Sequence, residues 1–448
     1  MPGESQTNDV IILGAGLAGL GAGYALSHSS TNSNSGSGTD VLVIEAGKTV
    51  GGLARTKNHH GFRFDLGGHR FKTSKPKIEQ LVRNILGDEL LVVKRSSKIL
   101  LRDKYFDYPL KPFNAVSGFG FPTTARIILE YITGLLKQPF VNKKIVSLED
   151  WVVRHFGRTL FNIYFREYSE KVWGINCNRI CMEWMEQRIQ KLSLWKAIKK
   201  ALFNYNNRDM HTLASEFLYP STGIGRIADR LEQEIKKNNR VLTNSRIVRI
   251  NHNGNSIETV TTRPGYADNR TNIETDNQVC DHRGNEFISS IPVATLVQLL
   301  HPRPPTEILE AASKLKYRDL VIVTIMLNRA RVTDQTWIYL PEQKIPFGRI
   351  HEPTNWSSKM APPGKTLLVT EFFCFRGDKT WSASDEELAE TTITNLINLG
   401  FIKRHEVLDQ VVLRIPRAYP LFEVGYTKQL EKICTYLERY KNLRLIGR

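Results

Sequence analysis

The chain has 448 residues, with 62 Lys and Arg against 45 Asp and Glu, so its formal net charge is +17. This length suits two or three compact domains, and no apolar run of about eighteen residues predicts a transmembrane helix. The short polar start and five cysteines without a disulfide or zinc spacing indicate a cytoplasmic protein with reduced thiols. The basic residues are dispersed, so we expect no nucleic-acid partner. A phosphate-bearing substrate or a peripheral membrane contact would account for the charge.

An apolar run at 10–13 leads directly into a G-x-G-x-x-G loop, which predicts a buried strand, a turn and a helix. Gly14 permits the tight turn, Gly16 lets the backbone approach a pyrophosphate, and Gly19 lets the helix pack close to the strand. The helix N-terminus offers free N–H groups to phosphates. The sequence therefore predicts a dinucleotide site at Gly14, Gly16, Leu17, Ala18 and Gly19.

The second predicted strand covers residues 40–45 and ends at Glu45, where a carboxylate meets the ribose hydroxyls, next to Ala46. A polar stretch at 29–39 lengthens the preceding loop, which costs little free energy. A second glycine pair follows at a fixed distance, and this segment resembles the one found in FAD-dependent amine oxidases and their relatives. That resemblance selects FAD over NAD and implies that the pair and its neighbours contact the cofactor: Gly51, Gly52, Leu53 and Arg55.

The next segment, residues 64–71, runs past the isoalloxazine ring in the same superfamily. It adds Gly67, Gly68 and His69 to the predicted cofactor contacts. An imidazole beside a flavin can tune its reactive nitrogens, so His69 is a catalytic candidate. The alternative is a histidine that hydrogen-bonds the backbone. Asp65 is expected to be structural rather than catalytic.

The remaining elements predict an α/β protein: a Rossmann-type FAD-binding domain of the GR2 kind, an inserted helical substrate domain and a mixed β-sheet. Ser147 and Ser384 are expected to cap helices, and residues 251–281 form a hairpin excursion. Runs at 321–327, 366–373 and 443–446 predict strands. The expected division is a Rossmann part at 1–110, a helical substrate-binding insertion at 111–218, an FAD-domain return with the hairpin at 219–300, a substrate-side sheet and helix at 301–425, and a final FAD-domain strand at 426–448.

Beyond the cofactor motifs, the chain resembles the UDP-galactopyranose mutases and amine oxidase-like proteins over nearly its whole length. The resemblance rests on segments 68–73, 105–110, 165–174, 219–223, 348–352 and 419–420. It implies a catalytic role for His69 and Arg349, and substrate contacts from Tyr168, Trp173, Arg188 and Tyr419. Arginines and tyrosine hydroxyls suit a diphosphate, and aromatic rings suit uracil and a sugar face.

The chain departs from the mutase pattern in three places. Phe372 stands where the mutases place a phosphate-binding tyrosine, and the segment 184–194 is not mutase-like in detail. The relatives continue past a last Gly-Arg with a loop and helix that close over the flavin, whereas this sequence stops at Gly447 and Arg448. Both residues are expected to contact the cofactor, and the chain is expected to be truncated.

Three functions follow from these features. The first is a flavoenzyme that acts on a nucleotide-sugar, with flavin N5 chemistry at the anomeric carbon. The second is a hydride-abstracting oxidase of the amine oxidase or protoporphyrinogen oxidase type. The third is a truncated, non-catalytic flavoprotein. The oligomeric state is not predicted.

Overall fold

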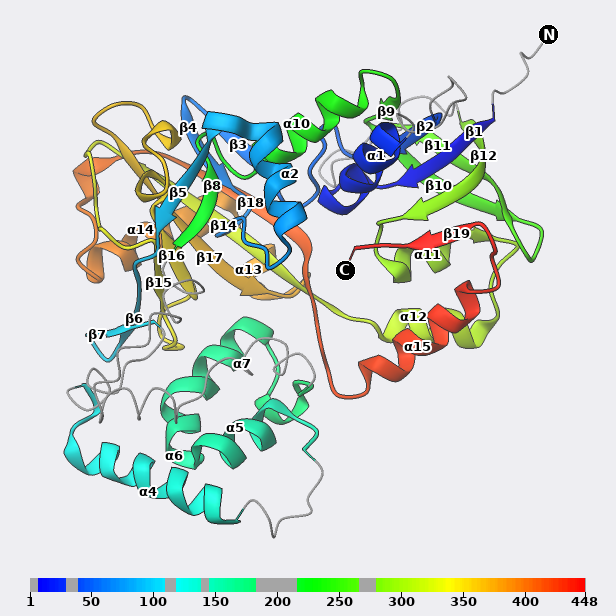
Figure 1. Ribbon diagram of the computed structural model, residues 1–448. Helices are drawn as coiled ribbons and strands as arrows, with labels where there is room; N and C mark the ends of the chain where they lie inside the picture. Colours follow the sequence, from blue (N-terminus) through cyan, green and yellow to red (C-terminus); the bar gives the residue numbers. More distant parts are fainter. Residues whose placement is uncertain are drawn as a thin grey trace.

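A computed structural model describes residues 7–29, 39–108, 118–137, 145–182, 216–265 and 279–447. Figure 1 shows two sheet-centred halves, with a group of helices below the second half. The chain crosses between the halves several times; for example, α12 (Thr306–Lys314) leads into β14 (Tyr317–Leu327), and β18 (Val407–Pro420) leads into α15 (Tyr426–Leu437). The fold is α/β, as the sequence predicts.

The first half is built on a parallel sheet in the order β9-β2-β1-β12-β19. These strands are β1 (Asn8–Leu13), β2 (Val41–Ile44), β9 (Arg240–Leu242), β12 (Cys280–Ser289) and β19 (Leu443–Leu445). The start of β12 (Cys280–Ser289) also pairs antiparallel with β11 (Ile257–Pro264), which pairs antiparallel with β10 (Ser245–His252). The short strand β13 (Leu300–His301) pairs parallel with β10.

Helices cover both faces of this parallel sheet, which is why β1 and β2 are almost continuously apolar. On one face, α1 (Leu17–Ser29), α10 (Gly225–Ile235) and α2 (Pro76–Leu86) form a core with Ile12 and Val43. On the other face, α11 (Val293–Leu299), α12 and α15 pack against Ile11 and Leu42. Such a doubly wound sheet binds ligands at the carboxyl ends of its strands.

The second half is a seven-stranded mixed sheet in the order β18-β14-β17-β16-β15-β6-β7. Its further strands are β17 (Thr366–Cys374), β16 (Arg349–His351), β15 (Trp337–Tyr339), β6 (Ser97–Leu101) and β7 (Lys104–Asp107). The helix α14 (Asp385–Asn398) covers one face. The strands β6 and β7 thus belong to this sheet, whereas the sequence division placed residues 1–110 in the Rossmann part. Their partner β15 lies far along the chain, so local pattern could not assign them.

Two short ribbons and a helical group complete the described structure. The hairpin of β3 (Thr56–His59) and β4 (Phe62–Asp65) follows the second glycine pair, and β5 (Leu90–Lys94) pairs with β8 (Glu216–Pro220). The helical group contains α4 (Phe121–Lys137), α5 (Leu148–Phe156), α6 (Arg158–Leu160), the π-helical turn η4 (Phe161–Arg166) and α7 (Glu167–Trp173).

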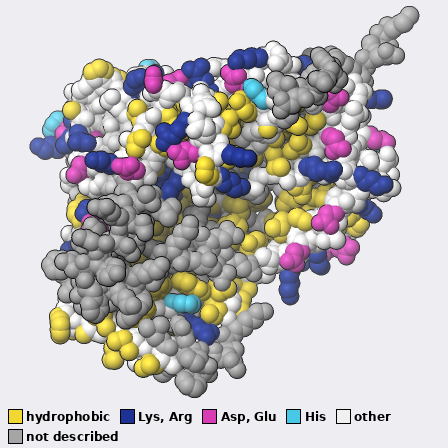
Figure 2. All heavy atoms as spheres, viewed as in Figure 1, with side chains coloured by type: hydrophobic (Ala, Val, Ile, Leu, Met, Phe, Trp, Pro, Cys, Tyr) yellow, Lys and Arg dark blue, Asp and Glu magenta, His cyan; other side chains and the backbone are white. Residues whose placement is uncertain are grey.

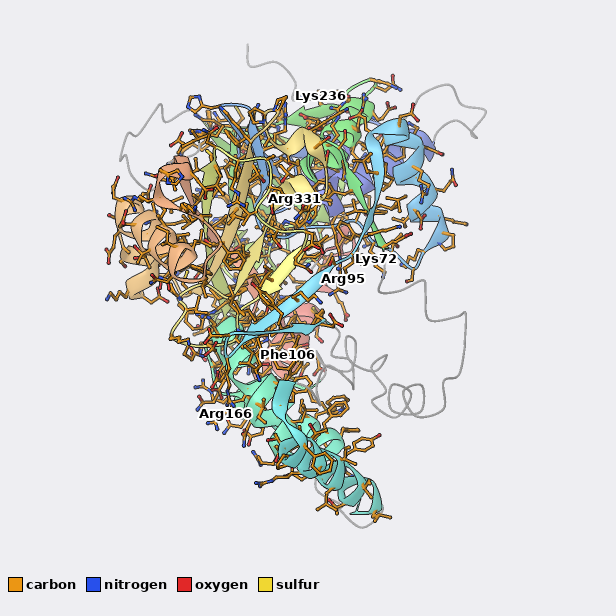
Figure 3. All side chains as sticks on the ribbon, turned by 90° about the vertical axis from the view of Figure 1, so that its left-hand side faces the viewer. Lys72, Arg95, Phe106, Arg166, Lys236 and Arg331 are labelled. Carbon is orange, nitrogen blue, oxygen red and sulfur yellow. The ribbon has the colours of Figure 1, made fainter. Side chains whose placement is uncertain are left out.

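Side chains join the helical group to the second sheet at β7. The ring of Phe106 on β7, labelled in Figure 3, stacks on Phe119 at a centroid distance of 4.8 Å and packs near Ile163 and Tyr164. The predicted caps of Ser147 and Ser384 are confirmed, because each side chain accepts a backbone N–H from the first turn of α5 or α14. Among the described helices, none is long and apolar enough to cross a bilayer.

The charged surface agrees with the dispersed basic residues of the sequence. Lys and Arg side chains are scattered over the face shown in Figure 2, with Asp and Glu between them. No single basic block stands out among the described residues of that face.

Candidate functional site

The first glycine loop has the geometry that its spacing predicts. Gly14 has a φ of +94°, and a Cβ atom on Gly19 would lie 1.9 Å from the carbonyl oxygen of Gly14. A Cβ atom on Gly16 would have no neighbour within 4 Å. The turn and the close helix packing therefore require glycine, while Gly16 faces the open space that a pyrophosphate would enter. Leu17 and Ala18 open α1 directly behind it.

The Glu45 carboxylate lies at the end of β2 and fixes this loop. It accepts the backbone N–H of Ala15 at 2.9 Å and that of Gly47 at 2.7 Å. A carboxylate has about four lone-pair sites, so Glu45 keeps acceptors for ribose hydroxyls. A cavity of about 460 Å³ opens beside Gly14, Glu45 and Ala46. The donors, the acceptor and the space fit the ADP part of a dinucleotide.

The second glycine pair packs directly on the first. The backbone N–H of Gly51 donates to the Ala15 carbonyl at 2.7 Å, and a Cβ atom on Gly52 would lie 3.2 Å from the Cα atom of Gly16. Arg55 donates from Nε to the Gly52 carbonyl at 2.7 Å, which holds its guanidinium at this junction. The two glycine motifs thus form one structural unit at the carboxyl edge of the parallel sheet.

The other predicted cofactor residues lie around this unit. Leu53 packs partly buried against the second half, and Gly447 has a φ of +90° and lies beside Ala18 at the start of α1. Arg448 and the substrate candidate Arg188 lie outside the described residues. The role of each individual residue in binding FAD stays a prediction.

Asp65 is a buried structural carboxylate. It accepts from the Thr56 hydroxyl at 2.6 Å, the Tyr219 hydroxyl at 2.6 Å and the backbone N–H of Ile224 at 3.1 Å. Burial raises the pKa of Asp65 to about 6, although these hydrogen bonds oppose the shift. Asp65 therefore links β4 to β8 and to the beginning of α10, all of which support the glycine unit.

The segment Gly67–His69 crosses from the glycine unit to the second sheet. Gly67 has a φ of +122°, and the His69 backbone N–H donates to the Gly67 carbonyl at 2.8 Å. The Gly68 backbone N–H donates to the Glu371 carboxylate on β17 at 3.1 Å. A Cβ atom on Gly68 would lie 2.4 Å from Nε1 of Trp337 on β15, so only glycine fits here.

Arg349 on β16 lies at the centre of a buried polar cluster. Its Nη2 atom donates to the Glu371 carboxylate at 2.6 Å and to the Tyr419 hydroxyl at 2.9 Å. Burial lowers the pKa of Arg349, but Glu371 together with the neighbouring tyrosines outweighs it and holds that pKa well above its usual value. The Nε atom of Arg349 is buried and has no acceptor within the described part of the chain. It is therefore free to donate to a ligand.

Aromatic rings from α7 and the sheet surround this arginine. Tyr168 meets Tyr339 edge to face at 5.7 Å, and Tyr339 packs on Tyr108 at 4.8 Å. Trp173 lies edge to face with Tyr419 at 6.5 Å. Burial raises the pKa of both Tyr168 and Tyr339, so both keep their hydroxyl protons at neutral pH. The structure thus brings Tyr168, Trp173, Tyr419 and Arg349 together beside Gly67–His69.

Comparison with known proteins decides the family. The family described as flavin containing amine oxidoreductase matches residues 17–417. The chain belongs to this family. It is accordingly an FAD-dependent enzyme, and the cofactor expected from the glycine motifs is confirmed.

Three similar proteins have names that bear on the reaction. Coproporphyrinogen III oxidase of Bacillus subtilis (strain 168) is 19% identical over an alignment of 458 residues, gaps included. The alignment covers 95% of this chain and 89% of that protein. Protoporphyrinogen oxidase 1, chloroplastic, of Arabidopsis thaliana is 22% identical over 453 residues, or 95% and 80% of the two chains. A structure of reduced UDP-galactopyranose mutase superposes with a TM-score of 0.78 at 21% identity, covering 98% and 89%. The mutase shares the fold of this flavoenzyme.

Sequence reasoning missed Glu371, which holds Arg349 and Gly68 together. A lone carboxylate inside the apolar run 366–374 was the available signal, because a fully buried charge needs a partner. Phe372, which the resemblance aligns with a phosphate-binding tyrosine, instead packs on Phe347 in the core beneath α14, with ring centroids 5.5 Å apart. Its neighbour Phe373 lies on the Arg349 side, 5.2 Å from ring centroid to guanidinium.

Sequence reasoning also missed Lys171 on α7. Its Nζ atom donates to the carbonyls of Leu340 and Glu342, both at 2.8 Å, and so ties α7 to the loop after β15. Burial lowers the pKa of Lys171 to about 7, although Glu342 and Glu167 oppose the shift. Lys171 thus holds the Tyr168 turn against the sheet in this flavoenzyme.

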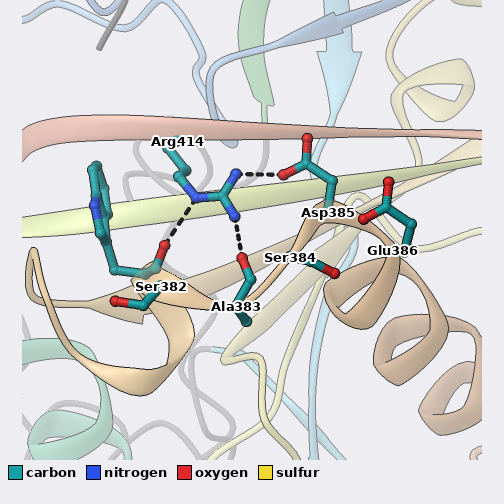
Figure 4. Close-up of a pocket in the computed structure, with 7 residues that line it drawn as sticks. Ser382, Ala383, Ser384, Asp385, Glu386 and Arg414 are labelled. Atoms are coloured by element: carbon teal, nitrogen blue, oxygen red, sulfur yellow. Dashed lines mark hydrogen bonds and ion pairs between the residues drawn. The ribbon is translucent and has the colours of Figure 1, made fainter. Parts of the chain in front are cut away.

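A second hollow, of about 470 Å³, lies between the start of α14 and Arg414 on β18. In Figure 4, the guanidinium of Arg414 donates to the backbone carbonyls of Trp381 and Ala383 and to the carboxylate of Asp385. These bonds fix the start of α14 on β18. Arg414 therefore has a structural role.

Proposed function

We propose that this flavoenzyme acts on a nucleotide-sugar, as a UDP-galactopyranose mutase does. The observation that carries the proposal is the buried Nε donor of Arg349, which has no acceptor in the described chain and lies beside the hydroxyl of Tyr419. A diphosphate would supply oxygen acceptors to the guanidinium and to the phenols of Tyr168 and Tyr419. The rings of Tyr339 and Trp173 would pack against the apolar faces of a sugar and a base.

The charge around Tyr339 supports an anionic substrate. Three arginines lie close enough to lower its pKa, namely Arg349, Arg95 and Arg70, although burial outweighs them. Arg95 lies over the Tyr108 ring at 4.9 Å, and Arg70 lies over the Trp337 ring at 5.3 Å. Glu371 pairs with Arg349, and a diphosphate bound in this cluster would lie among several guanidinium groups.

FAD, when bound, would supply the N5 chemistry at the anomeric carbon. The chain would bind and orient the substrate: Arg349 and the tyrosines would hold the diphosphate, and Gly67–His69 would form the wall on the flavin side. Burial keeps Tyr168 and Tyr339 protonated, so they would donate hydrogen bonds to the substrate. The protein would act chiefly by positioning and by electrostatics.

A second candidate is oxidation of a porphyrinogen, because the two named relatives above are porphyrinogen oxidases. The carboxylates of such a substrate would suit the same arginines. This candidate differs in its product, since six-electron oxidation of a porphyrinogen yields a fluorescent porphyrin. The two candidates are therefore separable in one preparation.

The test is a titration of the FAD-loaded enzyme with UDP and UDP-galactopyranose while the flavin absorption spectrum is recorded. We expect a saturable spectral shift that Arg349→Lys weakens and that Arg404→Gln, a change in an exposed ion pair far from the cluster, leaves intact. An unchanged spectrum at millimolar UDP, together with porphyrin fluorescence from coproporphyrinogen III in air, would replace the first candidate by the second.

We also propose a cytoplasmic location, no nucleic-acid partner and a peripheral membrane contact at most. The dispersed positive charge supports the last two, because it gives a general attraction to anionic surfaces without a concentrated basic track. Flotation of the protein with anionic vesicles would measure the membrane contact directly.

A further inference from the structure

The cavity beside Glu45 has a second wall that belongs to the other half of the molecule. Its first wall contains Gly14 and Ala46 from the parallel sheet, and its opposite wall contains Arg376, which follows β17, and Arg417 on β18. The Rossmann motif accounts for the first wall only. The arginines of the second wall therefore need an explanation of their own.

The backbone at Arg417 is shaped by an irregularity in the sheet. Leu320 pairs with Ile415 and Arg318 pairs with Tyr419, so residues 416–418 of β18 lie opposite the single residue Asp319 of β14. Arg417 itself adopts a left-handed φ of +55°, which is unfavourable for a residue with a side chain. Bulges of this kind redirect side chains near functional sites, and strained backbone is found at ligand-binding positions.

One buried carboxylate fixes both arginines. Asp319 accepts the backbone N–H of Arg376 at 2.7 Å with one oxygen and that of Arg417 at 2.7 Å with the other. The Arg417 side chain also donates from Nη1 to the Thr295 hydroxyl on α11, at 2.5 Å. Asp319 thus sets the backbone of both arginines at the cavity, the Arg417 guanidinium contacts α11, and the Arg376 guanidinium lies over the Trp381 ring at 5.5 Å.

The charges lining the cavity match a doubly negative ligand. Arg376 and Arg417 are joined by Arg246 on β10, and Glu45 is the one acidic group among the residues that line the cavity. The lining therefore carries an excess of two positive charges. A pyrophosphate carries the opposite charge, and guanidinium groups bind phosphate oxygens through two parallel hydrogen bonds.

We propose that Arg376 and Arg417 form an anion-binding wall that contacts the phosphates of FAD from the side opposite the glycine loop. The cofactor would then bridge the two halves of the enzyme, bound by backbone N–H groups on one side and guanidinium groups on the other. The proposal concerns the cofactor and is independent of which substrate the enzyme uses.

The test measures the affinity of the FAD-free protein for FAD from the quenching of flavin fluorescence. Arg417→Gln and Arg376→Gln should each weaken binding by about tenfold, and the double variant by more, because each removes a charge-assisted hydrogen bond. Arg404→Gln removes the same charge from an exposed ion pair elsewhere and should leave the affinity unchanged. Equal affinities in the wild type and all four variants would overturn the proposal.

A glycine variant separates cofactor binding from folding. Arg417→Gly removes the guanidinium and also relieves the left-handed strain, so its melting temperature should equal or exceed that of the wild type while FAD affinity falls as in Arg417→Gln. If Arg417→Gly restored wild-type FAD affinity, the loss in the glutamine variant would be due to the backbone and the proposal would be wrong.

Competition experiments identify the part of the cofactor that the wall contacts. ADP and adenosine are each used to displace FAD from the wild type and from Arg417→Gln. We expect the variant to lose affinity for ADP and to keep its affinity for adenosine. Equal losses for both competitors would mean that the guanidinium contacts the adenine or ribose, which would overturn the phosphate assignment.

Discussion

The Glu371 carboxylate joins Arg349 to the flavin-side segment, because one oxygen accepts from the Arg349 guanidinium at 2.6 Å and the other from the Gly68 backbone N–H at 3.1 Å. Glu371 is completely buried. Within the described residues, its partners at ion-pair distance are Arg349 and His351. Burial lowers the pKa of His351 to about 3, so Arg349 is the partner that carries charge at neutral pH. The position of the substrate-side cation is therefore tied to the segment that follows the glycine unit.

Glu371→Gln should destabilise the protein strongly. The change leaves the buried guanidinium without its counter-charge, and removing one partner of a buried pair typically costs about 3–5 kcal/mol. Chemical unfolding of both proteins measures the difference. Glu390→Gln is the matched control, because Glu390 forms an exposed ion pair with Arg404 and should change stability little. A loss for Glu371→Gln no greater than that of the control would show that the pair is not buried.

Tyr419→Phe should weaken UDP binding by about fivefold and leave FAD binding unchanged. The substitution removes one hydroxyl that accepts from Arg349 and would donate to the diphosphate, and a single hydrogen bond contributes about 1 kcal/mol. The flavin spectral titration reports UDP binding, and fluorescence quenching reports FAD binding. Tyr436→Phe is the control, because Tyr436 lies in the last turn of α15 and its hydroxyl contacts that of Tyr440 just past the end of this helix. Equal UDP affinity in wild type and Tyr419→Phe would remove Tyr419 from the substrate site.

The glycine unit could be predicted from the sequence because its constraints are local. The turn at Gly14 and the contact between Gly19 and the Gly14 carbonyl depend on residues five positions apart. The helix caps at Ser147 and Ser384 depend on residues three positions apart. Such short-range geometry follows directly from the order of residue types.

The polar cluster could not be predicted in the same way, since strands distant in sequence build it. The run at 366–374 predicts a strand, but not whether Phe372 or Phe373 faces Arg349, because a shift of one residue reverses the faces. That choice depends on the pairing of β17 with β14 and β16. The placement of β6 and β7 in the second sheet depends on β15 in the same non-local way.

Asp65 should make the stability of the protein depend on pH in the acidic range. Its pKa is raised from 3.8 to about 6 in the folded state, so the folded protein binds more protons than the unfolded chain between these values. The contribution of Asp65 to the free energy of unfolding is fully present below about pH 4, and it is lost as the pH rises through about 6. The shift corresponds to about 3 kcal/mol.

The measurement is the free energy of unfolding of wild type and Asp65→Asn at several pH values between 4 and 7. Asparagine does not titrate, so the difference between the two proteins isolates Asp65. We expect the wild type to lose stability relative to the variant as pH rises. A constant difference across this range would mean that Asp65 stays ionised in the folded protein.

Two glycines of α1 should respond to alanine in opposite ways. Gly19→Ala places a methyl group 1.9 Å from the Gly14 carbonyl oxygen, which forces the helix away from the loop and should abolish FAD binding. Gly21→Ala meets no atom within 4 Å and lies inside the same helix. It should bind FAD normally and raise stability by about 0.5–1 kcal/mol, because alanine loses less backbone freedom on helix formation. Fluorescence quenching and thermal unfolding of both variants measure these effects. FAD binding by Gly19→Ala at wild-type affinity would show that close packing of α1 on the loop is not required to bind the cofactor.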